Sequence, residues 1–170
     1  EENVQRFREG IHAAELICTR HGYYGDTYGH ILGVQAIERQ LAGDKQGARK
    51  YYERALRYFK RGSRGSVATM IPYGALLKEL EEFDAAATVL IEAVGSATDA
   101  RHRCCAHLEL GRLCRAQGEL TDAEGELLCA LRIARRHGFH DELGDIVREL
   151  ARLSADLGEH GIAERSYAVA

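Results

Sequence analysis

The densest group of reactive side chains is the run His102-Arg103-Cys104-Cys105-Ala106-His107. Residues three apart are neighbours on a helix, so His102 shares a face with Cys105, and Cys104 shares a face with His107. Imidazole and thiolate groups bind Zn²⁺, and neighbouring thiols can form a redox switch. Adjacent cysteines on a helix point about 100° apart, however, and the paired spacing of zinc ligands is missing. We therefore expect no bound metal, and we expect Cys105 and His107 to pack between helices.

Other signals for catalysis are weak. The segment GSRGS at 62–66 lacks the Lys-Ser/Thr that completes a phosphate-binding loop, and no HExxH, CxxC or nucleophile elbow occurs. His21 and His137 occupy equivalent positions near predicted helix ends, where a cation interacts favourably with the helix dipole. No carboxylate and nucleophile accompany them. We predict that the chain has no catalytic residues, needs no cofactor and is not an enzyme.

The composition narrows the classes of partner. The 170 residues carry a formal net charge of -3, which gives no overall field toward nucleic acid or an anionic membrane. No run reaches the roughly 18 apolar residues that span a bilayer. The five cysteines are odd in number and lie in helical patterns, which is typical of reduced thiols. The start EENVQRFREG is polar and lacks an initiator Met, so we expect a processed chain or part of a larger one. We predict a cytoplasmic location without membrane or direct nucleic-acid contact.

Small residues recur at matching positions in four consecutive segments, 38, 37 and 40 residues apart. Such a period is typical of an array of helical hairpins, in which a small side chain lets two helices approach closely. Larger apolar residues fall between the small ones at helical spacing. The three columns of small residues are Ala36, Gly74, Gly111 and Ala151; then Ala48, Ala86, Ala123 and Ala163; then Ala55, Ala93, Ala130 and Ala170.

The third copy, LGRLCRAQGELTDAEGELLCAL, places Leu-Gly, Gly118, Ala123 and Ala130-Leu131 in sequence. This pattern resembles the tetratricopeptide repeat (TPR), and the resemblance extends over about residues 26 to 170. It implies an all-α fold, a right-handed α-solenoid of antiparallel helix hairpins. The repeats are longer than the usual ~34 residues. In length they resemble the sensor arrays of large bacterial ATP-dependent regulators and other regulatory arrays, including kinesin light chains.

Several local features accompany the predicted repeats. Gly43, Gly118 and Gly158 stand at the turns within hairpins, where a left-handed backbone suits glycine, and Glu81 predicts a turn that closes differently. The proline that usually ends the second helix is absent, so we expect second helices about one turn longer. Pro72 is expected in or near a first turn, because elsewhere it would kink its helix. We predict one domain over 1–170, with a lone helix at 3–20 and repeats at about 27–61, 68–97, 101–137 and 141–170.

The resemblance implies that the first helices of the repeats line a concave, partner-binding face. That face is apolar early in the chain and rich in arginine later, which suits a segment with an apolar part and an acidic part. Alternatively, Glu109, Asp145, Glu149 and Asp156 neutralise the arginines as solvated pairs. The candidate partner-binding residues on this face are Ile37, Ile71, Lys78, Arg112, Arg115, Arg148 and Arg152.

Two further regions are candidates for contact with partners. Tyr23, Tyr24 and Tyr28 form an aromatic loop that suits either an interface or a packed turn between repeats. The chain ends in the apolar run 167–170, which is no polar cap, so more chain or self-association through this repeat is expected to cover it. The resemblance implies a non-catalytic scaffold that binds a protein or peptide, as part of a larger bacterial-type regulator. The alternative is a regulator that senses a small molecule or signalling peptide.

Overall fold

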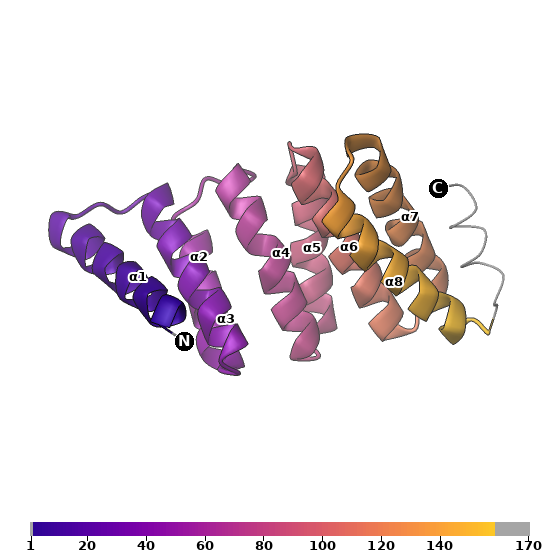
Figure 1. Ribbon diagram of the computed structural model, residues 1–170, viewed down its shortest axis with the longest axis horizontal. Helices are drawn as coiled ribbons and strands as arrows, with labels where there is room; N and C mark the ends of the chain where they lie inside the picture. The colour runs from indigo at the N-terminus through magenta and orange to yellow at the C-terminus, as the bar shows by residue number, and fades with distance from the viewer. Residues whose placement is uncertain (1, 159–170) are drawn as a thin grey trace.

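The computed structural model describes the backbone of residues 2–158 and, within that range, all side chains except those of residues 2–4, 7 and 8. In this range the chain forms eight α-helices and no strand, which confirms the all-α prediction (Figure 1). None of these helices is long and apolar enough to cross a membrane. The helices are α1 (Glu2–His21), α2 (Asp26–Leu41), α3 (Lys45–Leu56), α4 (Arg64–Glu79), α5 (Phe83–Ser96), α6 (Ala100–Gln117), α7 (Leu120–His137) and α8 (His140–Asp156).

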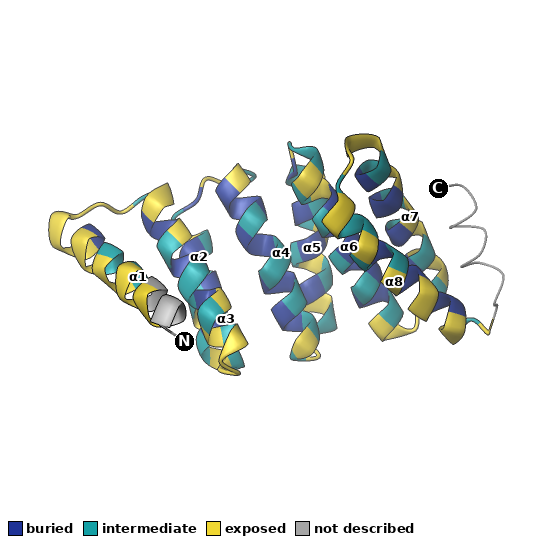
Figure 2. Ribbon diagram, viewed as in Figure 1, coloured by how far each residue is buried: buried dark blue, intermediate teal, exposed yellow. Residues whose placement is uncertain are grey.

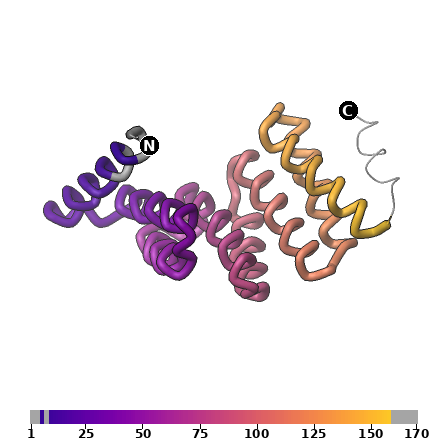
Figure 3. The backbone as a smooth tube through the Cα atoms, turned by 60° about the horizontal axis from the view of Figure 1, so that its bottom comes forward, coloured from indigo at the N-terminus to yellow at the C-terminus, as the bar shows by residue number. Residues whose placement is uncertain are grey.

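The helices form a single row of antiparallel hairpins. α2 packs on α3, α4 on α5 and α6 on α7, and the first helices α2, α4, α6 and α8 also contact one another in series. Figure 3 shows the row running in chain order from one end to the other. The predicted α-solenoid is therefore confirmed. α1 contacts α2 from the open end of the row, as a second helix without a first helix of its own.

The predicted small-residue columns hold the hairpins together. A Cβ atom added at Gly74 would lie 2.5 Å from Cγ of Leu90, and one at Gly111 would lie 2.8 Å from Cγ of Leu127. Each leucine side chain of the second helix thus occupies the space that a side chain on the first helix would need. The alanines of the other two columns are fully buried wherever the structure describes them, up to Ala130. Ala151 is exposed, while Ala163, Ala170 and the predicted last helix lie outside the described residues.

The turns within hairpins share one geometry, including the turn for which a different closure was expected. Gly43 and Gly118 have φ of 83° and 82°, and Glu81 has φ of 60°. The backbone N–H groups of Glu81 and Glu82 donate to Lys78 and Leu77, as those of the Gly118 turn donate to Arg115 and Cys114. The expectation for Glu81 was therefore wrong, because hydrogen bonds of the turn hold a non-glycine residue in the left-handed conformation.

The second helix of the first repeat is shorter than predicted. α3 ends at Leu56 instead of 61, and α4 begins at Arg64 instead of 68, with the Ser63 side chain accepting a hydrogen bond from the Ser66 N–H. Phe59 explains the early end, because its ring is buried between α2 and α4. Cβ atoms at Gly29 and Gly65 would lie 2.8 and 2.4 Å from this ring. The extra residues of this repeat therefore form the connection between α3 and α4, and its Phe59 side chain packs between α2 and α4. Of α3, α5 and α7, the second helices of the complete hairpins that the structure describes, α7 alone has the expected length.

Pro72 lies in the interior of α4 and not in its first turn. Because proline has no N–H, the Ala68 carbonyl loses its normal helical donor. Pro72 and Ala68 both line the groove between α2 and α4, so the modified stretch of backbone faces this groove. The helix continues past the proline to Glu79.

The glycine contacts predict opposite effects for two glycine-to-alanine substitutions. Gly111→Ala should lower the free energy of unfolding by about 1–3 kcal/mol, because the new Cβ meets Leu127 and, at 3.3 Å, the Ala123 carbonyl oxygen. Gly125→Ala, in α7 with nothing within 4 Å of its added Cβ, should raise it by up to about 1 kcal/mol. Urea unfolding of both variants checks this, and stabilisation by Gly111→Ala would contradict the packing argument.

Candidate functional site

The four candidate arginines lie together on α6 and α8, and all are paired with carboxylates of the chain. The centre of the group is Glu149, which is only 3% exposed. Its Oε1 lies 3.2 Å from Nε of Arg112 and 2.7 Å from NH1 of Arg152. Its Oε2 lies 3.6 Å from Nε of Arg115, and neither of these two atoms has a hydrogen-bond partner. A buried carboxylate thus holds three arginines from two helices.

The same network continues toward both ends of the face. Arg112 also binds Glu109, whose other oxygen lies 3.2 Å from Nζ of Lys78 on α4. Arg115 binds Asp156 at 2.9 Å. Burial by itself lowers the pKa of Arg112, but the negative charge of Glu109 and the hydrogen bond to it outweigh burial, so that the pKa is raised. Ion pairs thus tie three successive first helices, α4, α6 and α8, to one another.

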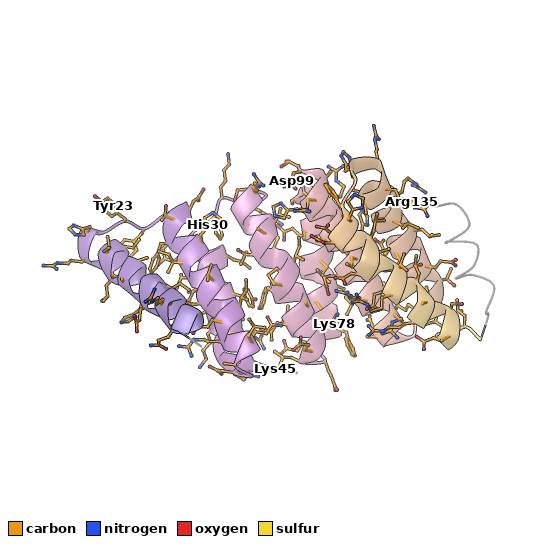
Figure 4. All side chains as sticks on the ribbon, viewed as in Figure 1. Tyr23, His30, Lys45, Lys78, Asp99 and Arg135 are labelled. Carbon is orange, nitrogen blue, oxygen red and sulfur yellow. The ribbon has the colours of Figure 1, made fainter. Side chains whose placement is uncertain are left out.

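The pairing leaves little free charge on this part of the face formed by the first helices. The five cations Lys78, Arg112, Arg115, Arg148 and Arg152 meet the four carboxylates Glu109, Asp145, Glu149 and Asp156. The side chains of Arg148 and Arg152 are 60% and 55% exposed, and each is paired through its NH1 atom. Guanidinium offers five N–H donors, so both retain donors for a further acceptor. Figure 4 shows this crowded, charged half beside Lys78.

The face formed by the first helices has a mainly apolar groove nearer the N-terminus. A groove of about 140 Å³ between α2 and α4 is lined by Val34, Ile37 and Pro72, with Gly33, His30 and Thr69 beside them. Ile37 is 42% exposed. Ile71 is partly buried against Val67 and Met70, so it belongs mainly to the core. Ile37 therefore lines the groove and is exposed, whereas Ile71 is partly buried and does not line it.

The aromatic loop is divided between packing and exposure. Tyr28 is buried, and its ring lies edge-on to Tyr58 at 4.9 Å and to Tyr24 at 5.5 Å between ring centroids. Tyr24 is nevertheless more than half exposed, and Tyr23, at 64%, stacks on His21. Phe139 stacks on His137 in the same way. The sequence Arg-His-Gly occurs at 20–22 and again at 136–138, and the stacked histidine and aromatic rings are repeated with it.

The His/Cys run on α6 is used for packing between α6 and its neighbours. His107 Nδ1 lies 2.6 Å from Oε2 of Glu126 on α7, and His102 pairs with Asp99 at the start of α6. The Cys104 thiol donates to the Ala130 carbonyl at 3.4 Å. Among the described residues no group of three His, Cys, Asp or Glu side chains could hold a metal ion.

Solved structures resemble this chain over nearly its whole length. The nearly identical TPR-like repeats of a kinesin light chain from Podosopora anserina have a TM-score of 0.71 at 16% identity, covering 98% of this chain and 86% of that chain. A single-substitution variant of that protein gives 0.74 at 15%, with the same coverage. MamA from Desulfovibrio magneticus RS-1 gives 0.60 at 18%, covering 95% of this chain and 91% of that chain. The fold is that of TPR-like repeats.

Comparison by sequence adds no family beyond this fold. No family model matches the chain, and no curated protein matches it in sequence. The resemblance to TPR-like structures therefore concerns the arrangement of hairpins. The side chains on the faces of those hairpins must be interpreted from this structure alone.

The ion-pair network predicts an unequal effect of two amide substitutions. Glu149→Gln should lower the free energy of unfolding by about 3 kcal/mol, because Arg112 and Arg115 then lose their buried counter-charge. Asp145→Asn removes a carboxylate whose side chain is 45% exposed and should cost less than about 1 kcal/mol. Chemical unfolding of the two variants measures the difference, and equal losses would show that Glu149 is not the centre of the network.

Thiol labelling tests the packing of the cysteines. Burial raises the pKa of the Cys104 thiol to about 12 and that of Cys114 to about 11. At pH 8 the reactive thiolate is then on the order of one part in a thousand or less. We expect iodoacetamide to leave both unmodified in the native chain and to modify both in urea. Cys129, which is partly exposed, is the internal control for reagent activity. Rapid native labelling of Cys104 would contradict this assignment.

Proposed function

We propose that this chain is a non-catalytic scaffold, a single domain that binds an extended or helical segment of a partner protein along its concave face. The observation that carries the proposal is the division of this face. Val34, Ile37 and Pro72 form an apolar groove, while the arginines beyond it are already paired. A partner would gain most from burying apolar side chains against α2 and α4.

A smaller contribution is proposed for an acidic residue of the partner. Arg148 and Arg152 keep exposed guanidinium donors on α8, and the cations of the network exceed its carboxylates by one. A carboxylate of the partner could bind there as a surface ion pair, which contributes about 1 kcal/mol or less. We therefore propose that apolar contacts determine affinity and that the arginines determine which way the segment lies.

The wider context is part of the same proposal. The length of the repeats, which resembles that of regulatory arrays, supports a place in a larger regulatory protein of the cytoplasm. Self-association through the C-terminal repeat involves residues outside the described range and stays a prediction.

Ligand sensing remains the second candidate because of one cavity. A space of about 340 Å³ between α1, α2 and α3 is lined by His12, Gln35, Arg39 and Tyr51. The Gln35 side-chain oxygen is buried and accepts no hydrogen bond, whereas its amide nitrogen donates to Glu15 at 2.7 Å. A small polar ligand that fills this space would contact the side chains of Gln35 and Arg39.

The groove is tested with peptides selected from a random display library on the immobilised chain. Ile37→Glu should weaken the selected peptides at least about tenfold, because it places a charge in the apolar groove. Ile91→Glu makes the same change at a 60% exposed isoleucine of α5, outside the groove, and should leave affinity unchanged. Fluorescence anisotropy of labelled peptides gives both dissociation constants.

Two outcomes would count against the groove. Peptides that bind both variants as well as the unmodified chain would place the binding surface elsewhere. A small molecule that raises the melting temperature of the unmodified chain and of Ile37→Glu alike, with no peptide selected, would favour sensing. Circular dichroism of each variant shows whether its helices are intact.

A further inference from the structure

The helix α1 is covered less completely than the other second helices of the array. Figure 2 shows α1 largely exposed, in contrast to α5 and α7 within their hairpins. α1 and α7 are in register, because Arg-His-Gly at 20–22 matches 136–138 and the stacked pairs His21–Tyr23 and His137–Phe139 follow. From residue 4 onward, each residue of α1 therefore corresponds to the residue 116 positions later in α7.

Three contacts show how α6 covers α7. His107 binds Glu126, Gly111 makes room for Leu127, and the Cys104 thiol donates to the Ala130 carbonyl. In register, Glu126, Leu127 and Ala130 correspond to Gly10, Ile11 and Ala14 of α1. All three of these residues line one cavity of about 560 Å³ on the open side of α1.

The other wall of this cavity corresponds to the part of α8 that contacts α6. Arg101 and Arg112 of α6 bind Glu142, Asp145 and Glu149 of α8. The small-residue column aligns Ala36 with Ala151, which places Thr27, His30 and Val34 of α2 at the positions of those carboxylates. These three residues, with Ile31 of α2 and Arg6 of α1, complete the lining of the cavity. The groove between α1 and α2 is thus equivalent to the surface of α7 and α8 that α6 covers.

We propose that this groove, lined by Ile11, Ala14, His30 and Val34, binds an amphipathic α-helix of a partner protein in the position that α6 takes on α7. The site continues the row of interfaces by which first helices cover second helices. It shares His30 and Val34 with the groove at Ile37 and Pro72, but its other wall is formed by α1 instead of α4. Ile11 and Ala14 on the α1 wall do not line the proposed peptide groove.

The groove between α1 and α2 places requirements on three positions of the helix that binds in it. The residue facing Ile11 must be Gly or Ala, as Gly111 is against Leu127. The residues facing Val34 must be apolar, because no carboxylate stands there to pair with an arginine such as Arg112. The Arg101 guanidinium in the first turn of α6 lies 5.1 Å from the ring centroid of Phe139. Tyr23 corresponds to Phe139, so a cation in the first turn of the bound helix would lie over the Tyr23 ring.

Charge argues against a second copy of this chain as the occupant. In a second copy α2, α4 and α6 are each covered by the second helix of their own hairpin. α8 exposes Ala151, but its first turn carries Asp141 and Glu142 where the groove favours a cation. Its Arg152 would also face the apolar wall at Val34. A partner helix with a basic first turn fits the groove better.

The probe is a stapled, fluorescein-labelled peptide of residues 100–117. It carries Arg112→Leu and Arg115→Leu to match the apolar wall, and serine replaces its three cysteines. Fluorescence anisotropy should show saturable binding to the chain. Ala14→Arg in the chain should weaken binding at least about tenfold, whereas Ala13→Arg, on the exposed side of α1, and Ile37→Glu should not. In the peptide, Gly111→Leu should abolish binding and Arg101→Ala should weaken it several-fold.

The proposal is overturned if the peptide does not bind, or if Ala13→Arg and Ala14→Arg weaken it equally while both variants keep the helical circular dichroism of the unmodified chain. It is also overturned if the chain alone sediments as a dimer that Ala14→Arg dissociates, because a second copy then fills the groove. Loss of peptide binding with Ile37→Glu would assign the helix to the concave groove. Failure of the concave groove leaves this experiment unaffected, since Ile37 does not line the cavity.

Discussion

Each hairpin depends on the close approach of its two helices at a residue with little or no side chain. Gly74 against Leu90 and Gly111 against Leu127 are the tightest of these contacts, and fully buried alanines continue them along each second helix. A leucine that fills the space above a glycine gains dispersion contacts on several sides, and it fixes how far apart the helix axes lie. Because each second helix also contacts the next first helix, this spacing passes from hairpin to hairpin.

With the spacing fixed by the core, the face formed by the first helices is free to vary in chemistry. Its C-terminal half is closed by ion pairs centred on Glu149, which couple α4, α6 and α8. Its N-terminal half has apolar side chains and a proline that removes a backbone donor. The charged half therefore serves the geometry of the array more than it serves recognition, since each of its arginines is already bound to a carboxylate of the chain.

The sequence was a good guide to features that repeat and a poor guide to features that occur once. The small-residue columns predicted the hairpins, and the hairpin of α6 and α7, from Ala100 to His137, lies within one residue of the predicted repeat at 101–137. Phe59 was missed because its partners Gly29 and Gly65 come from two other helices and share no period with it. The arginines were recognised, but only the structure shows that Glu149 is buried beneath them.

Repetition of the backbone also shows how one architecture can accept different helices. The surface of α8 that contacts α6 has carboxylates at Asp145, Glu149 and Asp156. The alignment of Ala36 with Ala151 places His30, Val34 and Leu41 at the equivalent positions of α2. On α6, Arg112 and Arg115 form ion pairs with these carboxylates. Leu41, which is 84% exposed, has no such counterpart on the open side of α2. Apolar residues there make an arginine-bearing helix costly to seat, because its charges would be desolvated without partners. A few positions on α2 and α8 thus determine which helix binds, while the contacts between small and large residues that position the helix stay the same.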